Sequence, residues 1–181
     1  DIPESVSAIS GDDIEKQGIK GLDKIGLAVP NLNLAMRTDG YPNVSIRGIG
    51  AFGLTQGVGF YLDDVQLFAD ASSRFGDLER IEVLKGPQGT LYGGSNIGGA
   101  VKFVSKRPTM GEDSGRIKVQ AGGQDSKDYE LSGNVAISDS WAMRVFAFNR
   151  DDKGFLTNPN SGGQNQPVDV GAYEEEGYRI S

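Results

Sequence analysis

Alternation of apolar and polar residues dominates the second half of the chain. In the stretch 129–138, apolar or small residues alternate with polar ones, and the stretch 141–150 repeats this pattern after a short turn. Residues 116–121 alternate in the same way. A period of two residues predicts strands with one apolar and one polar face. We therefore expect antiparallel strands from Gly111 onward.

The first half, residues 1–110, contains shorter segments separated by glycines. A serine followed by two aspartates in the stretch 10–13 predicts a helix N-terminus. Apolar residues at i, i+3 and i+7 in the stretch 22–29 predict a second short helix, which Pro30 ends. Helices and short strands within about a hundred residues indicate a compact α+β unit. The strands are expected around residues 6–9, 44–46, 60–62, 81–83 and 101–103.

The later stretches have the dimensions of membrane-spanning strands. The stretches 129–138 and 141–150 are each about ten residues long, as a tilted strand needs to cross a bilayer. The short turn between them is followed by a long polar loop at 153–173, and such alternation of turns and loops is typical of outer-membrane barrels. Tyr129 and Trp141 lie at strand ends, where aromatic girdles occur. A soluble antiparallel sheet with one hydrated face explains the alternation equally well.

Composition excludes several classes of function. The chain has 181 residues, a net charge of −7, and neither cysteine nor histidine. Disulfides, thiolate metal sites and histidine general bases are therefore impossible, and the sequence predicts no catalytic residue, metal site or cofactor. Without a basic patch, we expect no nucleic-acid partner. The chain starts without Met and stops within a predicted strand, so we expect it to be a piece of a longer protein.

Two local patterns suggest ligands, and each has a simpler explanation. The segment Gly48–Gly53 reads G-x-G-x-x-G, which in a nucleotide-binding enzyme must open a helix. The glycine-broken segment that follows predicts no helix, so a soluble enzyme with a nucleotide loop is only the alternative. The acidic residues Asp63, Asp64, Asp70 and Asp77 match no EF-hand spacing and are expected on solvated turns.

Three segments occur in a characteristic order: "NVSIRGIG", "GVGFYLDDVQL" and "DLERIEVLKGPQGTLYGGSNIGGAVKFVSKRP". In this order they closely resemble the plug domain of TonB-dependent outer-membrane receptors. Asp64 departs from the family pattern, which usually has glycine there, and Lys85 replaces an arginine found in many members. The family's TonB box is not recognisable in this chain.

The resemblance implies both a fold and a function. Residues 1–110 would form an α+β plug, a small mixed sheet with short helices. Residues 111–181 would form the first three to four strands of a 22-stranded barrel in the outer membrane of a Gram-negative bacterium, in contact with lipid. Such a receptor imports a scarce, bulky ligand with energy from a TonB–ExbB–ExbD complex. A ferric siderophore is the expected ligand, with haem, cobalamin or an oligosaccharide as alternatives. An adhesion or structural sheet protein is a rival of another class.

The resemblance also implies site residues in this chain. Ligand contacts are expected from apical loops of the plug, and charge contacts to the barrel wall from Arg47 and Lys85. The glycines of the stretch 86–99 would permit tight turns and close backbone packing, so they need no phosphate ligand. The expected ligand-binding residues are Arg37, Tyr41, Phe52, Gly53, Gln56, Phe68 and Phe75.

Overall fold

A computed structural model of the chain divides it into two compact units, residues 1–106 and 107–181. Each unit is described by itself. The structure describes residues 5–19, 22–36, 42–50, 57–67, 76–87, 96–123, 125–154, 156–158, 168–170 and 173–181.

Two short helices in the first unit confirm the helix signals of the sequence. Helix α1 (Gly11–Lys16) is capped by Ser10, whose hydroxyl accepts a hydrogen bond of 3.2 Å from the backbone N–H of Asp13. Helix α2 (Leu22–Ala28) ends just before Pro30, as predicted. No helix among the described residues is long and apolar enough to cross a membrane.

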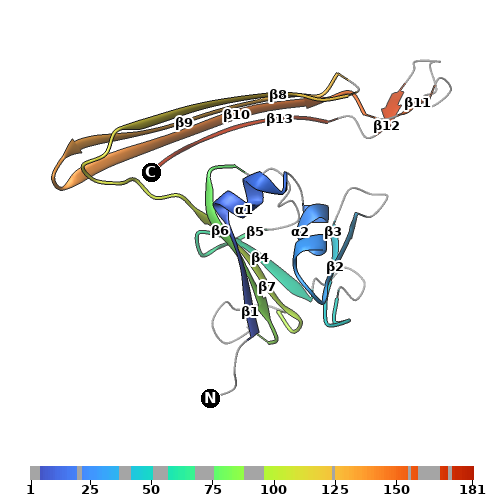
Figure 1. The fold of residues 1–181 in the computed structure, drawn as a ribbon. Coiled ribbons are helices and arrows are strands. Elements are labelled where there is room, and N and C mark those ends of the chain that lie inside the picture. Colours follow the sequence, from blue (N-terminus) through green and yellow to red (C-terminus); the bar gives the residue numbers. More distant parts are fainter. Residues whose placement is uncertain are drawn as a thin grey trace. The chain divides into compact units, whose positions relative to one another are not determined.

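A mixed five-stranded sheet forms the body of the first unit. Its order is β1-β6-β7-β4-β5, in which β4 and β7 are parallel and the other neighbours antiparallel (Figure 1). A separate hairpin of β2 and β3 lies beside helix α2, and its first strand was not predicted. The strands are β1 (Ser5–Ser10), β2 (Leu32–Met36), β3 (Pro42–Ile46), β4 (Val58–Leu62), β5 (Val65–Leu67), β6 (Leu78–Lys85) and β7 (Gly99–Ser105).

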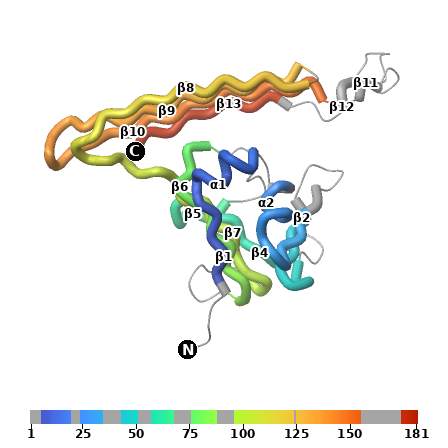
Figure 2. The backbone as a smooth tube through the Cα atoms, viewed as in Figure 1, coloured from blue at the N-terminus to red at the C-terminus, as the bar shows by residue number. Residues whose placement is uncertain are grey.

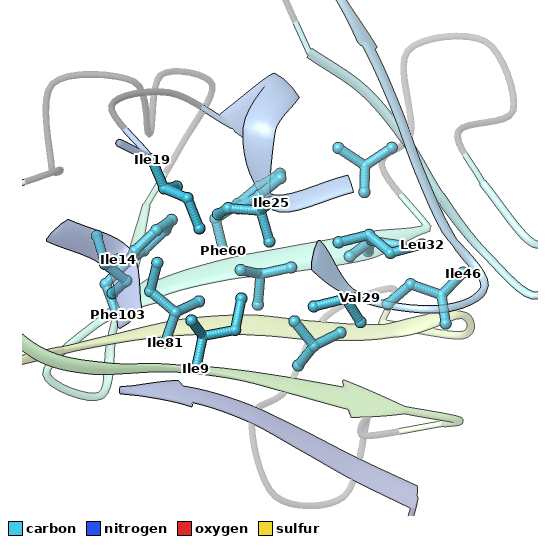
Figure 3. Close-up of a cluster of buried hydrophobic side chains, with 14 of the residues drawn as sticks. Ile9, Ile14, Ile19, Ile25, Val29, Leu32, Ile46, Phe60, Ile81 and Phe103 are labelled. Carbon is cyan, nitrogen blue, oxygen red and sulfur yellow. The ribbon is translucent and has the colours of Figure 1, made fainter. Parts of the chain in front are cut away.

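The core of this unit lies between the helices and one face of the sheet, as Figure 3 shows. Ile25 from α2, Ile81 from β6 and Phe103 from β7 are fully buried there. Each such side chain contributes about 1.5–3 kcal/mol by leaving water. The alternating residues of the short strands therefore stabilise the unit.

A four-stranded antiparallel sheet forms the second unit. Its order is β13-β10-β9-β8, and Figure 2 shows the strands side by side. As expected, Asp139 and Ser140 form the tight turn between β9 and β10. The described strands form an open sheet, not a closed barrel. The strands are β8 (Ser114–Ala121), β9 (Lys127–Ser138), β10 (Trp141–Asp152) and β13 (Tyr173–Ile180).

The long polar connection predicted at 153–173 contains two short strands that were not predicted. Strands β11 (Leu156–Asn158) and β12 (Val168–Val170) pair in an antiparallel hairpin within it. The pairing joins residues about ten positions apart, so a pattern of neighbouring residues did not reveal it.

Candidate functional site

The four-stranded sheet exposes an apolar face. In register, Ile117, Leu131, Ala147 and Tyr178 form one row across all four strands. Ile117 is 76% exposed and Tyr178 is 83% exposed. Soluble monomers rarely expose so continuous an apolar surface, so this face requires an apolar environment. The large apolar side chains exposed on it are Ile117, Val119, Tyr129, Leu131, Val135, Ile137, Trp141, Met143, Tyr178 and Ile180.

The opposite face of the same sheet carries paired charges. The Arg150 guanidinium donates to Glu130 at 2.8 Å, lies 3.5 Å from Asp128 Oδ1, and stacks over the Phe148 ring at 4.7 Å. Lys118 Nζ lies 3.3 Å from the same Glu130. One face of the sheet is thus apolar, and the opposite face carries paired charges. Such a division into an apolar face and a charged face is typical of the wall strands of transmembrane barrels.

Two described glycines of the stretch 86–99, Gly98 and Gly99, allow close backbone packing, as the sequence predicted. A Cβ added to Gly99 would lie 2.1 Å from the Leu84 carbonyl oxygen, and one added to Gly98 would lie 2.8 Å from the Ile49 carbonyl oxygen. Residues 88–95, between β6 and β7, lie outside the described part of the chain. At Gly98 and Gly99 backbone therefore occupies the space of a side chain, whereas a Cβ added to Gly86 would meet no atom within 4 Å.

A buried polar pair fixes the end of this glycine-rich stretch. Asn96 Nδ2 donates to Tyr61 Oη at 2.5 Å, and both residues are buried. A Cβ on Gly59 would lie 2.3 Å from Asn96 Oδ1, so this position of β4 must be glycine for the amide to fit. This hydrogen bond connects Asn96, just before β7, to Tyr61 on β4.

The segment read as a nucleotide loop begins with a tight turn. Arg47 and Gly48 have φ angles of 53° and 80°, and Ile46 and Ile49 exchange backbone hydrogen bonds of 2.9 and 3.0 Å across them. Two positive φ angles are typical of a type I′ hairpin turn. No helix begins among the described residues 46–50 and 57–67, and strand β4 begins at Val58.

The two predicted charge contacts differ in their surroundings. The Arg47 side chain is exposed. Lys85, at the end of β6, is only 9% exposed, and no ion pair of Lys85 is found among the described residues. A buried cation without a partner carboxylate is costly, so Lys85 is the stronger candidate for the predicted charge contact.

The acidic pair Asp63 and Asp64 has a structural role. Their φ angles are 47° and 73°, which form a tight turn between β4 and β5. Asp63 accepts a 2.8 Å hydrogen bond from the Ser105 N–H, and Asp64 lies 2.6 Å from Lys102 Nζ. Because positive φ favours glycine, the aspartate at position 64 makes this turn less permissive, as expected. Among the described residues no group of acidic side chains is placed to hold a metal ion.

All seven expected ligand-binding residues lie outside the described residues. They are Arg37, Tyr41, Phe52, Gly53, Gln56, Phe68 and Phe75. Their positions and contacts therefore stay predictions.

Sequence reasoning missed the roles of Asn134, Arg150 and Asn96. The side chain of each forms a hydrogen bond with a residue at least 20 positions away in the sequence. Alternation placed Asn134 on the polar face of its strand, but no neighbouring residue marked its partner. These contacts can be recognised only when the second strand or segment is placed beside the first.

Comparison with known proteins identifies the family. The family described as TonB-dependent Receptor Plug Domain matches residues 1–100, more than half of the chain. The chain belongs to the TonB-dependent receptor plug domain family. This is a family of receptors rather than enzymes, so the soluble-enzyme alternative is wrong. The plug with its mixed sheet and short helices, followed by antiparallel strands, confirms the predicted fold class.

Relatives of this plug-family chain are much longer receptors. The pesticin receptor of Yersinia pestis is 29% identical over 87% of this chain and 24% of its own length. The ferrichrome outer membrane transporter/phage receptor of Escherichia coli is 31% identical over 67% of this chain and 17% of its own length. The crystal structure of the ferric yersiniabactin uptake receptor FyuA from Yersinia pestis matches 99% of this chain and 28% of that chain, with 25% identity and a TM-score of 0.82. The chain thus matches 24%, 17% and 28% of the lengths of these three proteins.

Proposed function

We propose that this chain provides the plug and the first barrel strands of a receptor that imports a ferric siderophore across the outer membrane of a Gram-negative bacterium. The observation that carries the proposal is the succession of two units in one chain. A plug-family unit is followed at once by a sheet whose apolar face is exposed and whose polar face carries paired charges. The named ligands of the relatives, ferrichrome and ferric yersiniabactin, support a siderophore as the cargo.

The two units have separate tasks in this proposal. The plug, residues 1–110, closes the barrel lumen and contributes to ligand binding. Residues 111–181 form the first wall strands, whose apolar face contacts membrane lipid. A TonB–ExbB–ExbD complex supplies the energy, acting on a TonB box that is not recognisable in these 181 residues.

The ligand is proposed to meet the plug through residues of three segments. Arg37 would hydrogen-bond anionic oxygens of the ligand, and Phe52, Phe68 and Phe75 would offer aromatic surface to its apolar body. Tyr41, Gly53 and Gln56 belong to the same segments by the family resemblance.

Arg47 and Lys85 are proposed to bind carboxylates of the barrel wall. The burial of Lys85 supports this for its ammonium group, because a buried charge requires a partner. Arg47 is exposed within this chain, and its side chain is therefore available to a part of the receptor beyond residue 181.

The test is iron uptake by the full-length receptor in a Gram-negative strain that lacks its own siderophore receptors. Radioactive iron is supplied on hydroxamate, catecholate and phenolate siderophores in turn, with haem and cobalamin as alternative cargoes. We expect uptake on one siderophore class, and its loss in a strain without TonB. Uptake of haem or cobalamin alone would replace the proposed ligand, and uptake that persists without TonB would contradict the proposed energy source.

A further inference from the structure

A single buried amide holds the segment that precedes the first wall strand. Asn134 on β9 is 2% exposed. Its Oδ1 accepts a hydrogen bond of 2.9 Å from the Thr109 N–H, and its Nδ2 donates to the carbonyl oxygens of Thr109 at 2.8 Å and Glu112 at 2.5 Å. An asparagine amide has two N–H donors and one oxygen, so both donors and the oxygen are used on this segment.

A second bond fixes the other end of the same segment. The Asp113 carboxylate accepts a 2.7 Å hydrogen bond from the Ala136 N–H, two residues beyond Asn134 on β9. Residues 109–113, which we call the anchor segment, are therefore held to β9 before β8 begins at Ser114. All of these contacts lie within the second unit.

The anchor segment lies close in the chain to the last strand of the plug. Strand β7 ends at Ser105, and Thr109 is the first residue that Asn134 holds. Four residue steps span at most about 14 Å of extended chain. Pro108 restricts this short connection further, since its φ angle is fixed. The end of β7 is therefore tethered to β9 by four residue steps while the anchor segment is held, and by the nine steps from Ser105 to Ser114 when it is released.

We propose that Asn134 is the positioning residue that anchors the plug to the barrel wall during transport. The end of β7 then stays on a short tether to β9 while the plug rearranges. This inference rests on the proposed function, in which the plug rearranges to let a ligand pass. It assigns to one side chain the task of limiting how far that end of the plug can move.

The test uses the full-length receptor with Asn134→Ala and Asn134→Asp. The aspartate variant keeps the size and the acceptor oxygen but replaces both donors with an oxygen that repels the carbonyls of Thr109 and Glu112, whereas the alanine variant removes the amide without adding a charge. Ser132→Ala is the matched control, because Ser132 lies on the same face of β9 and makes no hydrogen bond to the anchor segment among the described residues. Hydrogen exchange of peptides covering residues 106–113 reports on the anchor segment directly.

We expect the Thr109 amide, which donates to Asn134 Oδ1, to exchange at least about tenfold faster in both variants than in the wild type. Asn134→Ala removes the acceptor, and Asn134→Asp loses the two bonds that hold the segment beside that acceptor. Ser132→Ala should exchange like the wild type. The strands β6 and β7 should keep their protection in every variant, because their pairing does not involve Asn134.

A second measurement separates anchoring from local stability. In cells, the Asn134 variants should admit a large hydrophilic antibiotic several-fold faster than Ser132→Ala, while binding of the siderophore at the cell surface is retained. Unchanged exchange of residues 106–113 would overturn the anchor, and so would faster exchange without any rise in leakage. A wild-type receptor that takes up no siderophore would count against the proposed function alone, because exchange and leakage are measured without a ligand.

Discussion

Gly99→Ala tests whether close backbone packing explains the glycines of the plug. Gly99 opens β7 with a φ angle of +138°, which L residues rarely adopt. An added Cβ would lie 2.1 Å from the Leu84 carbonyl oxygen and 2.9 Å from Ile46 Cδ1. Backbone strain costs about 1–3 kcal/mol and overpacking about 1–3 kcal/mol, so the free energy of unfolding should fall by about 2–6 kcal/mol. That is a large part of the roughly 5–15 kcal/mol that stabilises a domain.

Gly86→Ala is the matched control for the steric part of this loss. Gly86 also has a positive φ, +122°, but an added Cβ would meet no atom within 4 Å. It should therefore lose only the strain of about 1–3 kcal/mol. Urea unfolding of residues 1–110, followed by circular dichroism, measures both variants. Equal urea midpoints for the two variants would refute the packing explanation, because the Leu84 carbonyl would then have moved aside without cost.

The other predictions concern the sheet, the plug and the ligand. Residues 1–110 should form a monomer with a cooperative melt. The 181-residue chain should not insert stably in a bilayer, because its open sheet edges stay unpaired in lipid. Stable insertion of that chain in vesicles would contradict this. In the full receptor, Leu131→Arg should cost about 2–4 kcal/mol on folding into lipid if Leu131 lies near the midplane, measured by urea titration in vesicles. Arg47→Met should raise leakage of small solutes through the full receptor; unchanged leakage together with unchanged transport would argue against a charge contact. Arg37→Ala should weaken siderophore binding by about 1–3 kcal/mol, and equal affinity beside the control Lys20→Ala would remove Arg37 from the site.

Local patterns in the sequence determined most of the secondary structure. Alternation with a period of two placed β9 and β10, because successive side chains of any strand point to opposite faces. Ser10 with its two following aspartates placed the start of α1, because capping involves residues only three apart. The ordered motifs of the plug also indicated the family, which the family match over residues 1–100 confirms.

The tertiary structure decided what depends on residues far apart in the chain. The parallel pairing of β4 with β7 joins Val58 to Gly99, and the reason for a glycine at position 99 is the carbonyl of Leu84 on a third strand. In the sequence, Asn134 is one of several polar residues of an alternating strand. Only the structure shows its amide hydrogen-bonded to Thr109, 25 residues away. The pattern of neighbouring residues indicates which face of a strand a side chain occupies, but not which atom it contacts there. The contacted atom is placed only when the strands pair and pack, because pairing brings together residues whose separation in sequence leaves no periodic signal.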